Sequence, residues 1–322
     1  MKTSTSKRLR WNVAIWLAAG LFMTSTAGMA SGPIMPDPKA EARHQPQIEE
    51  TANGIPLVNI TAPSSGGVSR NEYETFNVPD KGAILNNSYT LSKTELAGYV
   101  QGNNNMAERP AKIIVNEVTG AGSTSMDGFL EVAGNRADVV IANPNGITVN
   151  GGGFINTGKA FLTTGKPVYD GEDHLQRFDI TGGDILIEGK GLGGKETGSL
   201  AILSRAVKIN AGIWAKDLHI TTGANTVDAK TLEASAIEGK GGRPAFALDT
   251  AAIGGMYAGR ITLVGTEKGL GVNNSGTWSA EDNLTLDWNG DLKNSGTIYS
   301  KGNADLRASR LENYKTIAAE RN

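Results

Sequence analysis

Three short segments of the sequence repeat one pattern: Asn274–Trp278 reads NSGTW, Asn294–Ile298 reads NSGTI and Asn313–Ile317 reads NYKTI. Their first residues are twenty and then nineteen positions apart. The residues between them alternate apolar and polar, as short β-strands do. A period of this size, built of strand-length pieces, is typical of a solenoid, in which turns stack because none can bury its apolar face alone.

The remaining sequence has the composition that such a solenoid needs. Glycine accounts for 42 of 322 residues, almost twice the usual share of about 7%. Glycine permits the positive φ that sharp corners require, and asparagine tolerates it. We predict an all-β right-handed parallel β-helix with an N-terminal cap and small β elements outside the helix, in which equivalent asparagines hydrogen-bond along the axis. A flat β-sandwich is the competing architecture, which the regular period disfavours.

One segment departs from the strand pattern. Leu91–Val100, LSKTELAGYV, is the best helical candidate, with Ser92 as a possible N-cap and Glu95 three residues later.

The ends of the sequence predict further organisation. Residues 1–30 combine four basic residues, a short apolar run and small residues before Ala30, as a signal peptide does. Residues 31–53 are rich in proline and charge and are interpreted as a flexible leader. The main β-helix domain is predicted over 54–265. Residues 266–322 are predicted to begin the repeats of about twenty residues, and because the third repeat is incomplete we expect a truncated array.

Charge and cysteine content exclude several classes of function. Without residues 1–30 the chain has 27 basic and 33 acidic residues, a net charge of −6, so it lacks the basic footprint of a nucleic-acid-binding protein. It contains no cysteine, hence no thiol nucleophile, no thiolate metal site and no disulfide.

The segment Asn143–Ile147, NPNGI, lies between two predicted strands. Pro144 fixes φ at the first corner of a turn and Gly146 can adopt the left-handed conformation, after which Ile147 resumes a strand facing inward. On this interpretation the motif first serves the fold.

Five blocks of the sequence resemble the N-terminal secretion domain of the filamentous haemagglutinin family. The similarity runs from about Gly54 to the end and includes the contact-dependent inhibition proteins. The blocks are Gly67–Ser88, Ile113–Gly120, Gly128–Gly165, Ala201–Gly223 and Phe246–Gly276.

The resemblance implies an exoprotein of a two-partner secretion system in a Gram-negative bacterium. A signal peptide would take the chain to the periplasm, where periplasmic modules of a dedicated outer-membrane β-barrel transporter recognise it. The chain would then fold outside as a β-helix, secreted or held at the cell surface, at the head of a large adhesin, haemolysin or inhibition toxin. Missing C-terminal parts would contact a host or neighbouring bacterial cell.

The family has two asparagine-rich motifs, and both have counterparts here. NPNGI is intact as Asn143, Pro144, Asn145, Gly146 and Ile147; the other, usually NPNL, is replaced by NNNM at Asn103–Met106. The motif is either an ordinary turn or also a docking element for the transporter. If it docks, replacing Asn145 should reduce export more than replacing Asn225, an asparagine expected in a loop. The candidate recognition or fold residues are Asn143, Pro144, Asn145, Gly146, Ile147, Asn103, Asn105, Asn116 and Glu117.

Catalysis finds little support in the sequence, and we expect no enzyme, cofactor or metal site. Asp184 and Glu188 lie on one face of a strand about 13 Å apart, which is too far for one cation. His219 is interpreted as a strand surface residue, and Trp214 and Trp278 as packing against neighbouring rungs. The alternative function is a secreted β-helix that binds or cleaves polysaccharides.

Overall fold

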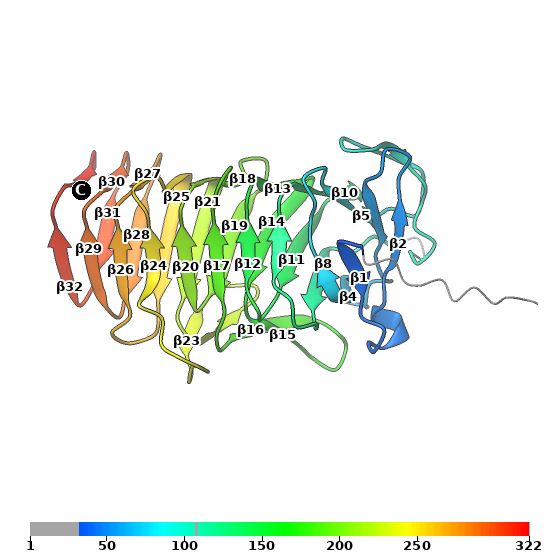
Figure 1. The fold of residues 1–322 in the computed structure, drawn as a ribbon, viewed down its shortest axis with the longest axis horizontal. Coiled ribbons are helices and arrows are strands. Elements are labelled where there is room, and N and C mark those ends of the chain that lie inside the picture. The colour runs from blue at the N-terminus through cyan, green and yellow to red at the C-terminus, as the bar shows by residue number, and fades with distance from the viewer. Residues whose placement is uncertain (1–31, 107–108, 322) are drawn as a thin grey trace, which may run out of the picture. The chain divides into compact units, whose positions relative to one another are not determined.

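A computed structural model describes residues 32–106 and 109–321, and the predicted signal peptide lies outside this range. Most strands form three parallel ladders that run side by side along the molecule, as Figure 1 shows. Each rung takes one strand from each ladder in turn, so the chain winds as a right-handed parallel β-helix, as predicted.

Within one rung the chain passes through the first, the second and then the third ladder. The first ladder contains β3 (Pro56–Asn59), β5 (Ala83–Asn87), β10 (Phe129–Gly134), β13 (Gly152–Ile155), β18 (Leu192–Gly194), β21 (Gly212–Thr222), β25 (Gly255–Gly265), β27 (Thr277–Ala280), β30 (Thr297–Ser300) and β33 (Thr316–Ala319). The second contains β4 (Val68–Phe76), β8 (Ile113–Val118), β11 (Ala137–Ala142), β14 (Thr157–Thr163), β19 (Ser199–Ser204), the later halves of β21 and β25, β28 (Leu284–Trp288) and β31 (Ala304–Arg307). The third contains β9 (Thr124–Met126), β12 (Ile147–Val149), β17 (Asp184–Ile187), β20 (Ala206–Ile209), β24 (Phe246–Thr250), β26 (Gly271–Asn274), β29 (Asp291–Asn294) and β32 (Arg310–Asn313).

The three repeats that begin at Asn274, Asn294 and Asn313 fall into register as predicted. Asn274 pairs with Asn294, which pairs with Asn313 on the next strand. The Asn274 carboxamide Nδ2 donates to Asn294 Oδ1 at 2.8 Å, and Asn294 Nδ2 donates to Asn313 Oδ1 at 2.7 Å. Asn274 and Asn294 are fully buried, and each side-chain amide donates its hydrogen bond to the asparagine of the next rung.

Inward-facing apolar side chains stack in columns to form one continuous core. One column in the first ladder runs Ile213, Met256, Trp278 and Ile298, all fully buried. Full burial of each such side chain contributes about 1.5–3 kcal/mol, so the core supports the fold without disulfides.

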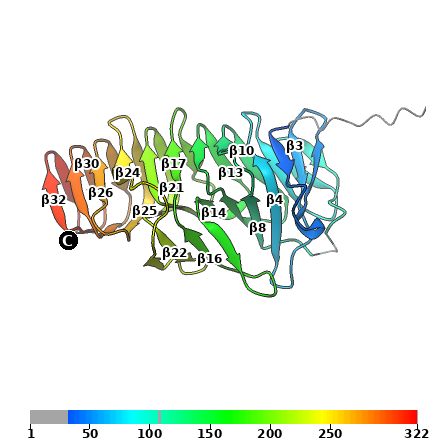
Figure 2. The same cartoon turned by 60° about the horizontal axis from the view of Figure 1, so that its bottom comes forward.

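A second, smaller apolar cluster lies on the outer face of the second ladder. Val115, Val140 and Phe161 stack there and are covered by a four-stranded antiparallel sheet outside the β-helix, which Figure 2 shows beneath the rungs. That sheet, the extra-helical sheet, contains β15 (Lys166–Tyr169), β16 (Leu175–Ile180), β22 (Asn225–Asp228) and β23 (Ala234–Ala236).

The flexible leader predicted for residues 31–53 is wrong over the residues that the structure describes. This segment contains β1 (Ile34–Pro36), the 3₁₀-helix η1 (Ala42–His44) and β2 (Gln47–Glu50), together called the N-terminal cap. β1 pairs with β4 and β2 with β3, both antiparallel. The proline-rich, charged composition suggested disorder. The first rungs, however, have open strand edges, and their backbone N–H and C=O groups form hydrogen bonds with those of the cap.

The helix predicted over Leu91–Val100 is also wrong. The segment forms an antiparallel hairpin of β6 (Ser92–Thr94) and β7 (Gly98–Val100), closed by Gly98 at a φ of 71°. Ser92 Oγ donates to Ser88 Oγ at 2.8 Å and caps no helix. The backbone N–H groups of Glu95 and Leu96 donate to the Glu131 carboxylate, so a tertiary contact overrides the local helical preference.

Candidate functional site

The NPNGI segment forms a tight turn between β11 and β12, at the corner from the second ladder to the third. The Gly146 N–H donates to the Asn143 carbonyl at 3.1 Å, and the Asn145 N–H donates to Asn143 Oδ1 at 2.9 Å. Gly146 has a φ of 111°, and a Cβ there would lie 3.0 Å from the Asp184 carbonyl oxygen. Ile147 is 2% exposed and starts β12 facing inward. The turn therefore has the geometry predicted from the sequence.

The same asparagines fasten the turn to the preceding rung. Asn143 Nδ2 donates to the Gly122 carbonyl and to Thr124 Oγ1, both at 3.0 Å. Asn145 Nδ2 donates to the Gly120 carbonyl at 2.8 Å. Asn143 is fully buried, whereas Pro144 and Asn145 are exposed. Only these two residues of the motif are open to a partner in the folded chain.

The NNNM segment builds an equivalent turn at another corner, after β5 of the first ladder. The Asn105 N–H donates to Asn103 Oδ1 at 2.9 Å, and the Met106 N–H donates to the Asn103 carbonyl at 3.1 Å. Asn103 Nδ2 donates to the carbonyls of Ile60 and Asn86, at 2.9 and 3.0 Å. Met106 is 4% exposed, so the fourth position of this turn is a buried apolar side chain.

Asn116, on β8, is placed by the structure inside the β-helix. It is fully buried, accepts a hydrogen bond from the Tyr73 hydroxyl at 2.9 Å and donates to the Val140 carbonyl at 3.1 Å. In the folded chain it serves the core and is closed to a partner.

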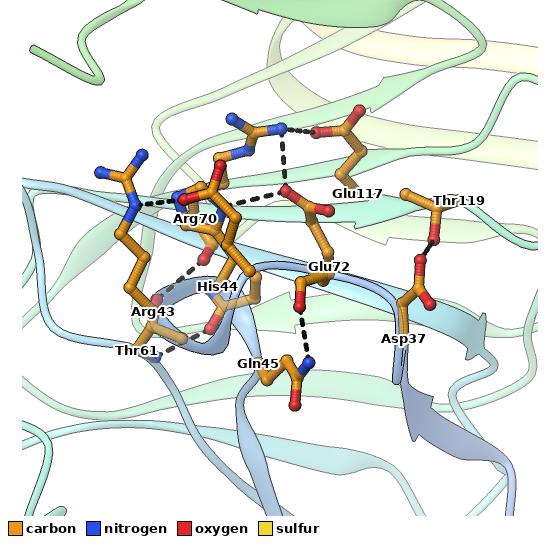
Figure 3. A network of polar contacts seen from close by, with 12 residues as sticks. Asp37, Arg43, His44, Gln45, Thr61, Arg70, Glu72, Glu117 and Thr119 are labelled. Atoms are coloured by element: carbon orange, nitrogen blue, oxygen red, sulfur yellow. Dashed lines mark hydrogen bonds and ion pairs between the residues drawn. The ribbon is translucent and has the colours of Figure 1, made fainter.

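Glu117, the next residue, points to the outer face and joins a polar cluster that the sequence did not predict (Figure 3). Its strand partner in register is Glu72 on β4. Arg70 Nη2 lies 2.8 Å from Glu72 Oε1 and 3.5 Å from Glu117 Oε2. His44 Nδ1, from the cap, lies 3.0 Å from Glu72 Oε1. Arg70 and Glu72 stand two residues apart on one strand, and this same-face spacing was the one available signal for the cluster.

The pKa values of Glu117 and His44, the two ends of this cluster, are shifted in opposite directions. Burial raises the pKa of the Glu117 carboxyl to about 7, although Arg70 acts in the opposite direction. Burial lowers the pKa of His44, and the nearby Arg70 charge lowers it further. A cavity of about 450 Å³ adjoins the cluster and is lined by Arg70, His44 and Asn105 among others. The structure thus brings the NNNM turn near the Glu117 cluster, whereas the NPNGI turn lies at a different corner.

Asn225 was expected in a loop, and this is wrong. It begins β22 of the extra-helical sheet and is fully buried. Its Nδ2 donates to the Thr222 carbonyl at 3.1 Å and to Thr266 Oγ1 at 3.0 Å. Replacing it would damage the fold, so it is a poor control for Asn145.

No cluster of metal-ligating side chains is assembled in the described part of the chain. No group of three or more His, Asp or Glu side chains there could hold a metal ion. His219 is half-buried and alternates with the inward-facing Leu218 and Ile220, so it lies on the outer face of β21 as predicted. Burial lowers its pKa to about 4. Trp214 stacks on Tyr257 of the next rung, with ring centroids 6.1 Å apart, and Trp278 lies in the core. Both tryptophans therefore pack against neighbouring rungs, as predicted.

Within residues 32–106 and 109–321, no helix is long and apolar enough to cross a membrane.

Comparison with known proteins identifies the family to which this β-helix belongs. A family profile described as the TPS secretion domain matches residues 33–298. The chain belongs to this family. It is also similar to a solved filamentous hemagglutinin secretion domain, with a TM-score of 0.75 and 31% identity, over 89% of this chain and 100% of that one.

Three curated relatives extend the comparison. The chain is 43% identical over 297 residues to a protein named Toxin CdiA from Yersinia pestis, covering 85% of this chain and 9% of that protein. It is 46% identical over 249 residues to a 16S rRNA endonuclease CdiA from Enterobacter cloacae, covering 76% of this chain and 8% of that one. It is 42% identical over 259 residues to a tRNA nuclease CdiA-2 from Burkholderia pseudomallei, covering 80% and 8%. The chain spans less than a tenth of the length of these relatives.

Membership of the TPS family has direct consequences. The chain is a secretion domain of the kind found in CdiA and filamentous haemagglutinin exoproteins, which are secreted or cell-surface proteins of Gram-negative bacteria. The family implies a cognate outer-membrane transporter as the partner. The polysaccharide-binding or polysaccharide-cleaving alternative is not favoured by these relationships.

Proposed function

We propose that periplasmic modules of a β-barrel transporter recognise this chain through its N-terminal cap and the Asn143–Ile147 turn. One observation supports this turn: two of its residues, Pro144 and Asn145, are exposed in the folded chain, whereas the NNNM turn exposes only Asn104 fully. The turn also fastens two rungs, so the same segment would serve both recognition and rung stacking.

Folding outside the cell would then proceed from this end of the β-helix. Every strand of a rung pairs in parallel with the rung before it, so each completed rung is a template for the next. Burial of each new rung would draw the chain outward. The chain would head a large adhesin, haemagglutinin or contact-dependent inhibition toxin, whose remaining parts would contact a host or neighbouring bacterial cell. We assign it no enzymatic activity, no cofactor and no nucleic-acid partner.

A secretion assay tests the partner. The chain is expressed in cells with and without its cognate barrel, and the amount in the medium is measured. We expect release only with the barrel, and equal release without it would contradict the proposal.

A pair of variants tests the turn. Asn289, between β28 and β29, occupies the same corner of a later rung as Asn145, is exposed, and donates to the Thr266 carbonyl of the preceding rung at 3.3 Å. Asn145→Ile should reduce export several-fold, whereas Asn289→Ile should leave it near the wild-type level. The thermal unfolding of both purified variants separates a docking defect from a folding defect. Equal export by two equally stable variants would leave NPNGI as an ordinary turn.

A further inference from the structure

The Glu117 cluster joins three parts of the chain that are far apart in sequence. Arg70 and Glu72 come from β4, Glu117 from β8, and His44 from η1 of the cap. The Arg70 guanidinium also lies over the ring of Tyr169, at the end of β15, with 4.4 Å from its central carbon to the ring centroid. The cap is also held by the β1–β4 and β2–β3 pairings, and the extra-helical sheet by the apolar cluster beneath it. Both parts meet the β-helix again at this polar cluster.

The charges within the cluster do not balance. Glu72 and Glu117 face each other on neighbouring strands, and like charges in this position repel. Arg70 is the arginine that pairs with both carboxylates. Its Nη2 lies 2.8 Å from Glu72 Oε1 but 3.5 Å from Glu117 Oε2. Glu117 Oε2, Arg70 Nε and Tyr169 Oη are buried without a hydrogen-bond partner among the described residues. Two ionised carboxylates in such a place are costly, and a proton on one of them relieves the cost.

Charges from neighbouring elements do not supply the missing compensation. Arg43 of the cap is turned to Asp173, beyond β15, with 2.6 Å between Nη1 and Oδ2, and this pair bridges the cap to the extra-helical sheet. Lys166 on β15 is exposed and acts on Glu117 only as a distant charge. The charged or titratable groups around the cluster are thus Arg70, Glu72, His44, Arg43, Tyr169, Lys166 and Asp173. Of these, Arg70, Glu72 and Lys166 act on Glu117 through their charges.

We propose that this cluster is a proton-operated clasp: with a proton on Glu117 the cap and the extra-helical sheet are held on the β-helix, and loss of that proton loosens both. Opening admits water to a carboxylate that is otherwise buried beside Glu72. The open form is therefore favoured once Glu117 is ionised.

The direction of the pH effect follows from linkage. The pKa of Glu117 is raised from an ordinary 4.5 to about 7, so the closed form holds the proton more tightly than the open form. The stability of the closed form falls as pH rises from about 4.5 to about 7 and then levels off. His44 acts oppositely, because its lowered pKa makes the closed form lose stability as pH falls below about 6.5.

Hydrogen exchange on the whole chain tests the clasp. Amide protection in β2 and in β15–β16 is compared at pH 5.5 and 7.5, after correction for intrinsic exchange. We expect the opening equilibrium of both segments to rise about tenfold at the higher pH. In Glu117→Gln this rise should vanish or reverse, because only His44 still titrates. Glu74→Gln, an exposed carboxylate on the same β4 strand, should keep the wild-type response.

The side chain itself provides a second readout on the unmodified chain. An NMR titration of the Glu117 carboxyl carbon should show a midpoint near 7. Equal protection at both pH values, an unchanged response in Glu117→Gln, or a carboxyl midpoint near 4.5 would overturn the proposal. This inference stands independently of how the transporter recognises the chain.

Discussion

The turns at Asn103–Met106 and Asn143–Gly146 make the same bonds with different sequences. In each turn, Oδ1 of the first asparagine accepts a hydrogen bond from the N–H of the third residue at 2.9 Å. Nδ2 of the same asparagine donates to a backbone carbonyl earlier in the chain. The second position is asparagine in one turn and proline in the other, and it is exposed in both. The fourth position is a buried methionine in one and a glycine with positive φ in the other. The geometry therefore constrains the first asparagine most strongly.

The largest effect is expected when that first asparagine is removed. Asn143→Ala and Asn103→Ala each delete a buried amide that makes several hydrogen bonds and leave its backbone partners unsatisfied. Each should lower the free energy of unfolding by about 2–4 kcal/mol. Denaturant unfolding of both variants measures this loss. A loss at Asn103 below a quarter of that at Asn143 would show that the turns are not equivalent.

A smaller effect should separate the turns at their fourth residue. Gly146→Ala places a Cβ at a φ of 111° and 3.0 Å from a carbonyl oxygen, and should cost about 1–2 kcal/mol. Met106→Leu preserves an apolar residue of similar volume and should cost less than about 1.5 kcal/mol. The same unfolding experiment compares them. If Met106→Leu lowered the free energy of unfolding more than Gly146→Ala, the fourth position would not be a conformationally restricted corner in one turn and a core side chain in the other.

The asparagine repeats were predictable because a solenoid converts a sequence period directly into spatial register. Asn274, Asn294 and Asn313 lie one above another for that reason alone. The cap and the Glu117 cluster were not predictable in this way. His44, Arg70 and Glu117 belong to different segments, and no period relates them, so only the folded chain shows that they meet. The Leu91–Val100 hairpin was missed because Glu131, 36 residues after Glu95, supplies the partner for its turn.

The smallest effect is expected for Asn104→Pro, which gives the NNNM turn the proline that the NPNGI turn has at its second position. Asn104 is exposed and its N–H makes no backbone hydrogen bond among the described residues, so Asn104→Pro removes no bond of the turn. Proline there would mainly reduce the conformational freedom of the unfolded chain, which should raise the free energy of unfolding by about 0.4–1 kcal/mol. Asn143 already precedes a proline while making the bonds that Asn103 makes, so the pre-proline restriction is compatible with this turn. Matched denaturant curves for Asn104→Pro and the unmodified chain measure the gain. A loss of stability would mean that the backbone at Asn104 differs from that at Pro144, and the equivalence of the two turns would then extend only to their asparagine side chains.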